Sequence, residues 1–200
     1  VFPLTAGSGN YTIGVYENIS GNQYATALNE QMRITIKNEF GPYLYPNQYV
    51  NFTAQSQVVN KAQALAASAD SDIDVVTSVY NYIIDNISYD YDKAKSVTSG
   101  YLPDVDTVLS SQKGICFDYA AVMTAMLRSQ RIPTRLEVGY MGDVYHAWIS
   151  IYTKETGWVN GIIKFDGKNW ELMDPTFAST SKSPKNFTSE NSKYTTKYVY

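Results

Sequence analysis

The sequence contains one cysteine and one histidine, Cys116 and His146, and an aspartate, Asp174, follows them in a Met-Asp-Pro-Thr segment. A thiol, an imidazole and a carboxylate are the three groups of an activated sulfur nucleophile. The imidazole takes the thiol proton, and the carboxylate orients the imidazole. The residue types and their order therefore predict that Cys116, His146 and Asp174 form a catalytic triad.

The residues around Cys116 predict the start of a buried helix. Gly114 breaks the preceding structure, and small and apolar side chains then recur at helical spacing, at Ala120, Met123, Ala125, Met126 and Leu127. The exposed N–H groups and the helix dipole at such a position favour an anion, and so favour the thiolate form of cysteine. The alternative for a lone cysteine on an apolar helix is a small buried hydrophobic residue.

His146 and Asp174 are predicted to lie on strands of an antiparallel sheet. Alternation over residues 144–152 predicts the His146 strand, and Trp148 shares its face because side chains alternate along a strand. Trp148 either shields the imidazole from water or packs in the core. A preceding strand through Tyr140 and the turn 141–143 lead into this strand. A third strand is predicted over 157–165, an Asp-Gly hairpin turn at 166–167, and a fourth strand over 168–173 that ends at Asp174.

Several blocks of this region together resemble a known family. They are Gly114-Ile-Cys-Phe-Asp-Tyr-Ala120, Leu127-Arg128 followed by Ile132-Pro-Thr-Arg135, Val138-Gly-Tyr140, His146-Ala-Trp148, Gly157-Trp158 and Asp174-Pro-Thr176. In this order they resemble the signature of the transglutaminase-like superfamily of thiol acyltransferases and peptidases. The resemblance implies an α+β, papain-like core, with the nucleophile at the N-terminus of a buried helix that packs on an antiparallel β-sheet. Within this superfamily, the sequence resembles the bacterial secreted type of domain.

The resemblance implies acyl transfer on protein or peptide amides through a cysteine thioester, with Cys116, His146 and Asp174 as catalytic residues. Capture of the thioester by an amine would make a transglutaminase, and capture by water a deamidase or a peptidase. The alternative is a catalytically idle binding or assembly module of an exported protein. No cofactor and no metal are expected, because one histidine and one cysteine fall short of a usual metal ligand set.

Donors that would stabilise an oxyanion are expected beside the nucleophile. The backbone N–H of Cys116 is the first candidate. Tyr89, Tyr101 and Gln112 precede the motif and are side-chain candidates among which the sequence does not choose. Asp118 and the tyrosine after it are predicted to support the helix entry rather than to take part in the chemistry.

The chain is predicted to form a β-extension over residues 1–55 and a catalytic core over residues 56–200, with the motifs between 113 and 177. The extension either packs on the core or is an arm that docks onto a larger protein or a wall component. Alternation predicts two strands in the extension, over 11–18 and 31–38. An aromatic run over 40–49 is read as a loop pinned to the body by its rings, with a sugar or peptide platform as the alternative. Two helices are predicted between Gln55 and Ile87, with aspartates 70–74 as caps rather than calcium ligands. A terminal strand is predicted over 194–200.

Composition excludes several classes of function. The formal net charge of −3 gives no basic surface for nucleic acid, and no apolar run is long enough to span a bilayer. A single cysteine excludes an internal disulfide framework. Only 18% of residues are charged, which favours a secreted or cell-envelope location, with the signal or anchor outside this sequence. The expected partners are a protein or peptide substrate and a cell-wall or other extracellular protein.

Overall fold

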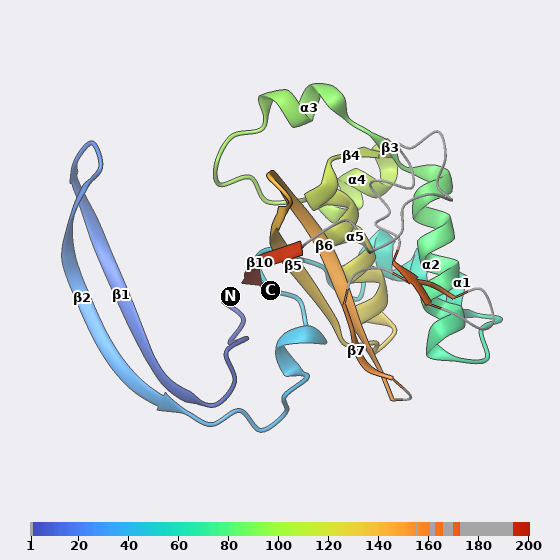
Figure 1. Ribbon diagram of the computed structural model, residues 1–200, viewed down its shortest axis with the longest axis horizontal. Coiled ribbons are helices and arrows are strands. Elements are labelled where there is room, and N and C mark those ends of the chain that lie inside the picture. The colour runs from blue at the N-terminus through green and yellow to red at the C-terminus, as the bar shows by residue number, and fades with distance from the viewer. Residues whose placement is uncertain (1, 155, 161–162, 166–169, 173–193) are drawn as a thin grey trace.

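Helix α5, Cys116–Ser129, runs through the centre of the protein (Figure 1). The computed structural model describes residues 2–154, 156–160, 163–165, 170–172 and 194–200. Every side chain of α5 from Asp118 to Arg128 is buried. The helix packs on the sheet strands β5, Thr134–Met141, and β6, Val144–Thr153, and on three further helices. The predicted buried helix that begins at Cys116 is confirmed.

The main sheet is antiparallel and has the order β10-β5-β6-β7. Strand β7 is Gly157–Val159, and β10 is Tyr194–Val199. The register of the central pair places Gly139 opposite His146. The predicted strands on either side of the turn at 142–143 and the predicted terminal strand are confirmed. The terminal strand forms one edge of the sheet beside β5.

Four further α-helices lie around α5 in the part of the chain that the structure describes. They are α1, Gln57–Ala66; α2, Asp72–Asn86; α3, Tyr91–Ser96; and α4, Val105–Ser111. Three of them, α1, α2 and α4, pack on α5. Helix α2 begins where the Ser71 hydroxyl accepts from the N–H of Asp74, with Asp72 also in the first turn. The prediction is confirmed only in part: Asp72 and Asp74 lie in the first turn, where their carboxylates offset the helix dipole, but the residue that caps the helix is Ser71 and not an aspartate. No helix among the described residues combines the length and the apolar character that crossing a membrane requires.

The predicted third strand is wrong in its extent. The structure has two short strands in its place: β7 in the main sheet, and β8, Ile163–Phe165, which pairs with β9, Trp170–Leu172, in a separate two-stranded sheet. The sequence after β7 continues as Asn160-Gly161, a dipeptide that favours a turn over a continuous strand. The predicted turn at 166–167 and Asp174 lie outside the described residues.

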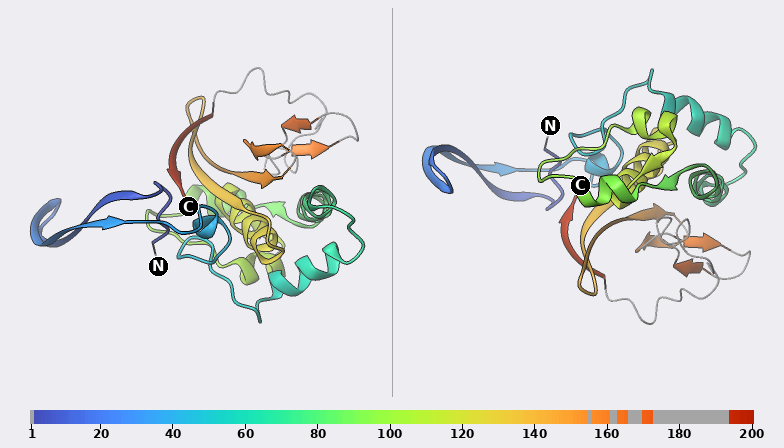
Figure 2. Two further views of the ribbon diagram at one scale, coloured as in Figure 1. Left: turned by 90° about the horizontal axis from the view of Figure 1, so that it is seen from below. Right: turned by 90° about the horizontal axis from the view of Figure 1, so that it is seen from above.

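The N-terminal extension forms a long hairpin of β1, Gly9–Ser20, and β2, Gln23–Ile34. The second strand was predicted at 31–38, but it begins directly after the turn at Gly21, whose φ is +51°. Of the two alternatives for the extension, packing on the core is wrong for the hairpin, which projects from the body and is exposed along most of its length (Figures 1 and 2). Alternation predicts a strand but does not say which surface covers it.

The aromatic loop after the hairpin is fixed to the body, as predicted. Tyr43 and Val50 are buried, and the short 3-10 helix η1, Gly41–Tyr43, packs its tyrosine edge-on against Trp158 at 5.2 Å between ring centroids. Beside this loop lies Arg128 of α5, which is fully buried. Its guanidinium donates to the carbonyl oxygens of Thr134, Tyr45 and Tyr200 at 2.7–3.0 Å. Burial lowers the pKa of Arg128 to about 9, and the nearby Tyr43 acts in the opposite direction.

Replacing Gly139 with alanine is expected to destabilise the protein by pushing β10 off the sheet. The added methyl carbon would collide with the backbone carbonyl of Thr195, which a rotamer change cannot relieve. We expect a loss of roughly 1–3 kcal/mol, measured by urea denaturation. Gly9→Ala, at an open position of β1, is the matched control. Equal denaturation midpoints for the two variants would contradict the close approach of β10 to β5.

Candidate active site

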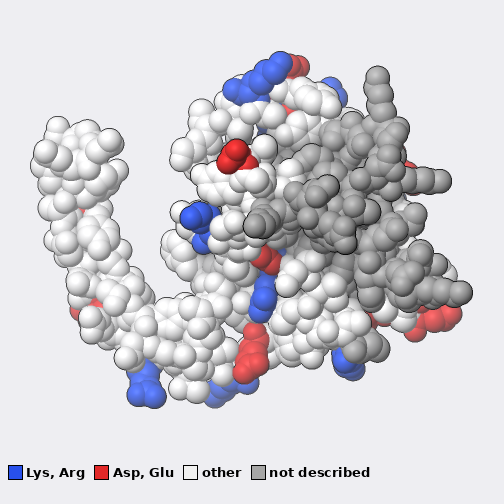
Figure 3. Space-filling view, in the orientation of Figure 1, with Lys and Arg blue, Asp and Glu red and all other residues white. Residues whose placement is uncertain are grey.

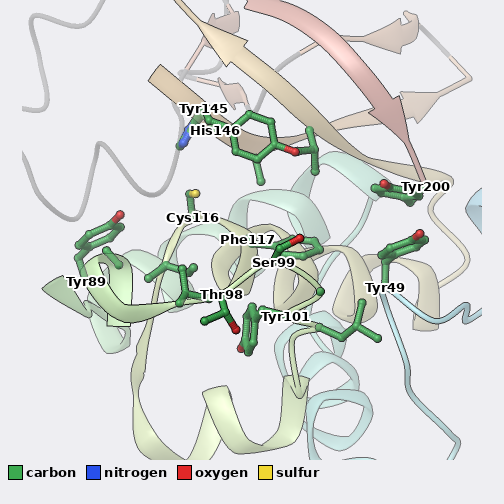
Figure 4. A pocket seen from close by; sticks show the side chains of 17 residues that line it. Tyr49, Tyr89, Thr98, Ser99, Tyr101, Cys116, Phe117, Tyr145, His146 and Tyr200 are labelled. Carbon is green, nitrogen blue, oxygen red and sulfur yellow. The ribbon is translucent and has the colours of Figure 1, made fainter. Parts of the chain in front are cut away.

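Cys116 and His146 line the same pocket, which has a volume of about 460 Å³ (Figure 4). Cys116 comes from the start of α5 and is partly exposed, whereas His146 comes from β6 and is 4% exposed. In Figure 4 the sulfur points from the helix start toward the side of the pocket where Tyr145 and His146 lie. Two of the three residues of the predicted triad therefore line one pocket. Asp174 lies outside the described residues, and its role stays a prediction.

The backbone turn that carries Cys116 is held by Asp118. One carboxylate oxygen of Asp118 accepts from the N–H of Ile115 at 2.8 Å, which satisfies a donor that the helix start leaves without an intrahelical partner. Gly114 packs so closely on this residue that a methyl group there would lie 2.6 Å from the Asp118 β-carbon. The sequence Gly-Ile-Cys-Phe-Asp thus sets the position of Cys116 through its first and last residues.

Asp118 is itself the centre of a polar network below the pocket. Its carboxylate is fully buried and pairs with the Lys93 ammonium at 2.7 Å, and it accepts from the Tyr101 hydroxyl at 2.5 Å. The Lys93 ammonium also donates to the Tyr101 hydroxyl. Burial, and then the hydrogen bond to Asp118, raise the pKa of Tyr101, so its phenol stays protonated. The predicted supporting role of Asp118 is confirmed, and Lys93 is a partner that the sequence did not indicate.

A second connection ties the wall of the pocket to the residues before Cys116. Strand β3, Ser88–Tyr89, pairs in parallel with β4, Lys113–Gly114. The hydroxyl of Tyr119 in α5 donates to the carbonyl of Ile87 at 2.6 Å. Tyr89 is placed beside Gly114 by this pairing and lines the pocket.

Trp148 lies beside His146, as the strand period predicts. The two rings are stacked, with centroids 6.3 Å apart and planes at 25°. Trp148 is 4% exposed and packs edge-on against Tyr194 of β10 at 4.9 Å. The buried indole therefore screens one side of the imidazole from water and at the same time packs the sheet.

The three side-chain candidates for an oxyanion donor differ in whether they line the pocket. Tyr89 and Tyr101 line the pocket, but the Tyr101 hydroxyl is already engaged with Asp118 and Lys93. Gln112 is not among the lining residues and ends α4 in the left-handed conformation, with φ of 54°.

Sequence reasoning missed Tyr145, which precedes His146 and lines the pocket beside Cys116. Desolvation raises the pKa of the Tyr145 phenol, and Tyr198, Tyr140 and Cys116 act in the same direction. Tyr145 thus remains a protonated donor at neutral pH. Its place next to the only histidine was the signal available in the sequence.

The far end of the pocket is aromatic and uncharged. Tyr49 and Tyr200 come from distant parts of the chain and stack with ring centroids 3.6 Å apart. Leu102 and Phe117 also line the pocket. Among the described residues that line the pocket there is no Asp, Glu, Lys or Arg. The described residues contain no group of three His, Cys, Asp or Glu side chains that could hold a metal ion.

The fold and the site define an α+β domain in which a thiol at a helix start and an imidazole from the adjacent sheet share one cavity. The family model of the transglutaminase-like superfamily matches residues 59–161, and the chain belongs to this superfamily.

The individual proteins that the chain resembles in sequence share about a quarter to a third of their aligned residues with it. The chain is 25% identical to the uncharacterized protein YebA of Bacillus subtilis over 207 aligned residues, which cover 92% of this chain and 25% of that protein. It is 31% identical to the UPF0252 protein MJ1282 of Methanocaldococcus jannaschii over 97 residues, which cover 42% of this chain and 27% of that protein. The chain thus spans about a quarter of the length of these relatives. A crystal structure titled "Putative Cysteine Protease", from Cytophaga hutchinsonii, is similar over 70% of this chain and 43% of that one, with a TM-score of 0.50 and 21% identity.

Proposed function

We propose that the protein is a thiol-dependent enzyme that transfers acyl groups from protein or peptide amides through a thioester on Cys116. The observation that carries the proposal is the shared pocket, where a partly exposed thiol at the first residue of α5 lies on the same cavity as His146. The helix start favours a thiolate there. Membership of the transglutaminase-like superfamily supports the assignment.

In the proposed reaction, His146 holds the proton of Cys116 as an imidazolium. The thiolate sulfur bonds to the amide carbonyl carbon, and the backbone N–H of Cys116 donates to the resulting oxyanion. The carbon–nitrogen bond then breaks, and the amine leaves with the proton from His146, which gives the thioester. An amine or a water molecule attacks the thioester, passes its proton to His146 and releases Cys116. Asp174 is proposed to orient the imidazole.

The pocket also suggests which acyl donors are accepted. Apart from Cys116 and His146, the described residues that line it are uncharged, and the Tyr49–Tyr200 stack supplies apolar surface at the end away from Cys116. A charged substrate side chain would lose its hydration there without gaining an opposite charge. We therefore expect the pocket to favour amides in uncharged, apolar sequences. The proposal covers transglutaminase, deamidase and peptidase activities, which differ in the amide attacked and in whether an amine or water takes up the acyl group.

We extend the proposal to a secreted or cell-envelope enzyme whose partner is a cell-wall or other extracellular protein. The support is compositional: 18% of residues are charged, and the face of the hairpin in Figure 3 is almost uncharged.

Cys116 is expected to react with iodoacetamide at neutral pH much faster in the wild type than in His146→Ala, because the variant lacks the imidazolium that stabilises the thiolate. The measurement is the rate of alkylation at neutral pH, followed by mass spectrometry. Tyr140→Phe, on the neighbouring strand, is the matched control. An inert or ordinary thiol that does not respond to the histidine would favour the idle binding module.

A further inference from the structure

A second cavity, of about 550 Å³, lies at the base of the hairpin. It is lined by residues 4–8, by Ile36 and the start of the aromatic loop, and by residues of β5, β6 and β7, and it shares no described lining residue with the Cys116 pocket. Arg135 faces Ser150 across the sheet, whereas His146 faces Gly139. The two cavities are thus separated by about 13 Å along the strands. We call this space the Arg135 cavity.

The guanidinium of Arg135 is held in place by two aromatic rings. Its central carbon lies 3.7 Å from the ring centroid of Trp158 and 4.9 Å from that of Tyr43. Tyr43 is in turn fixed by its hydroxyl, which donates to the carbonyl of Thr5. Such cation–π contacts offset part of the cost of removing the charge from water. They provide no oxygen acceptor for the N–H groups.

The hydrogen-bonding state of Arg135 is the unusual feature of the cavity. Its Nε is buried and has no hydrogen-bond partner, and Arg135 donates to no side chain or carbonyl among the described residues. By contrast, Arg128 is buried in the core and donates to three different backbone carbonyls. A buried N–H without a partner destabilises the folded chain, so such a group points to an acceptor that is supplied from outside the chain.

We propose that the Arg135 cavity binds a carboxylate carried on an apolar body, as in a peptide C-terminus or a free monocarboxylic acid. A carboxylate that approaches the guanidinium side-on accepts from Nε and one terminal nitrogen together. The rings of Phe40, Tyr152 and Trp158 line the space for the apolar body, and the cavity volume is typical of a small-molecule site. Glu39 also lines the cavity, so a ligand with a second negative charge is disfavoured. This inference does not depend on the proposed enzymatic function.

The test is calorimetric titration of the full chain with N-acetylphenylalanine and with N-acetylphenylalanine amide, which differs only in lacking the carboxylate. We expect the acid to bind at least about tenfold more tightly than the amide, because the amide cannot form the ionic pair. Alkylation of Cys116 should leave this binding unchanged. Equal affinity for acid and amide, no binding at millimolar acid, or loss of binding on alkylation would overturn the proposal.

Two variants locate the binding on Arg135. Arg135→Gln should weaken binding of the acid by about tenfold or more, whereas Arg131→Gln should not. Arg131 is the matched control, because it also stacks on a tyrosine, Tyr45, but does not line the cavity. Thermal melting shows whether each variant is folded, and equal binding by a folded Arg135→Gln protein would refute the site. A peptide ending in Gly-Gly-Phe with a free carboxylate then separates the two sources: tighter binding than the free acid indicates a chain terminus, and weaker binding a small acid.

Discussion

A Cys116→Ala protein is expected to lose at least about a thousandfold in the rate of amide acyl transfer or hydrolysis while keeping its fold. The sulfur is the atom that forms the thioester under the proposed mechanism, and no other cysteine exists to replace it. The side chain is partly exposed, so its truncation removes little buried contact. The measurement is release of ammonia or amine from glutamine-containing and plain peptides, with circular dichroism to follow the fold.

Ser99→Ala is the matched control for this experiment, because Ser99 lines the same pocket but has no part in the proposed chemistry. His146→Ala should match the loss seen for Cys116→Ala. Asp174→Ala should cost less, because an imidazole that is poorly oriented still accepts a proton. Turnover by the Cys116→Ala protein at the wild-type rate would refute the mechanism but would leave the Arg135 cavity untouched.

Asp118→Ala is expected to destabilise the protein by about 3–5 kcal/mol, the range for breaking a buried ion pair by removing one partner. The carboxylate is fully buried and has three partners. Its removal would leave the Lys93 ammonium without an opposite charge, and the Tyr101 hydroxyl and the Ile115 N–H without an acceptor. The free energy of unfolding from urea denaturation measures the effect.

Asp104→Ala provides the matched control, because this aspartate caps α4 at an exposed position and accepts from a single backbone N–H, that of Thr107. It should cost about 1 kcal/mol. A loss for Asp118→Ala that is no larger than the loss for Asp104→Ala would show that the Lys93 network contributes little. If the Asp118→Ala protein is stable but its Cys116 is alkylated slowly, the network positions Cys116 rather than stabilising the fold.

Local patterns in the sequence predicted the elements that carry the site. A helix that starts at Cys116 and a strand that holds His146 follow from apolar spacing over a few residues, and both are confirmed. The start of β2 was missed because alternation was recognised only from residue 31, whereas the strand begins directly after the turn at Gly21. The division of the third strand into β7 and β8 was missed because alternation alone does not mark where a strand ends.

The partners that meet through the fold had no local signal. Lys93 lies in a short helix far from Asp118 in the sequence, and the Tyr49–Tyr200 stack joins the aromatic loop to the C-terminal residue. Such pairs are fixed by how α5, the sheet and the aromatic loop pack together, which periodicity does not encode. The same holds for Arg135, whose position in a strand suggests only an alternating side chain and not a buried donor between rings.

The pairing of β10 with β5 also bears on how quickly the pocket is completed during folding. The hairpin of β1 and β2 joins neighbouring segments, and such local pairing is fast. Strand β10 reaches β5 only after a long stretch of chain has closed into a loop, and this closure carries Tyr200 into the wall of the Cys116 pocket. We therefore expect the pairing of β10 with β5 to be the last contact of the sheet to form, and it completes the wall of the Cys116 pocket. Under the proposed mechanism, activity would then develop with strand closure rather than with formation of the helix that bears the thiol.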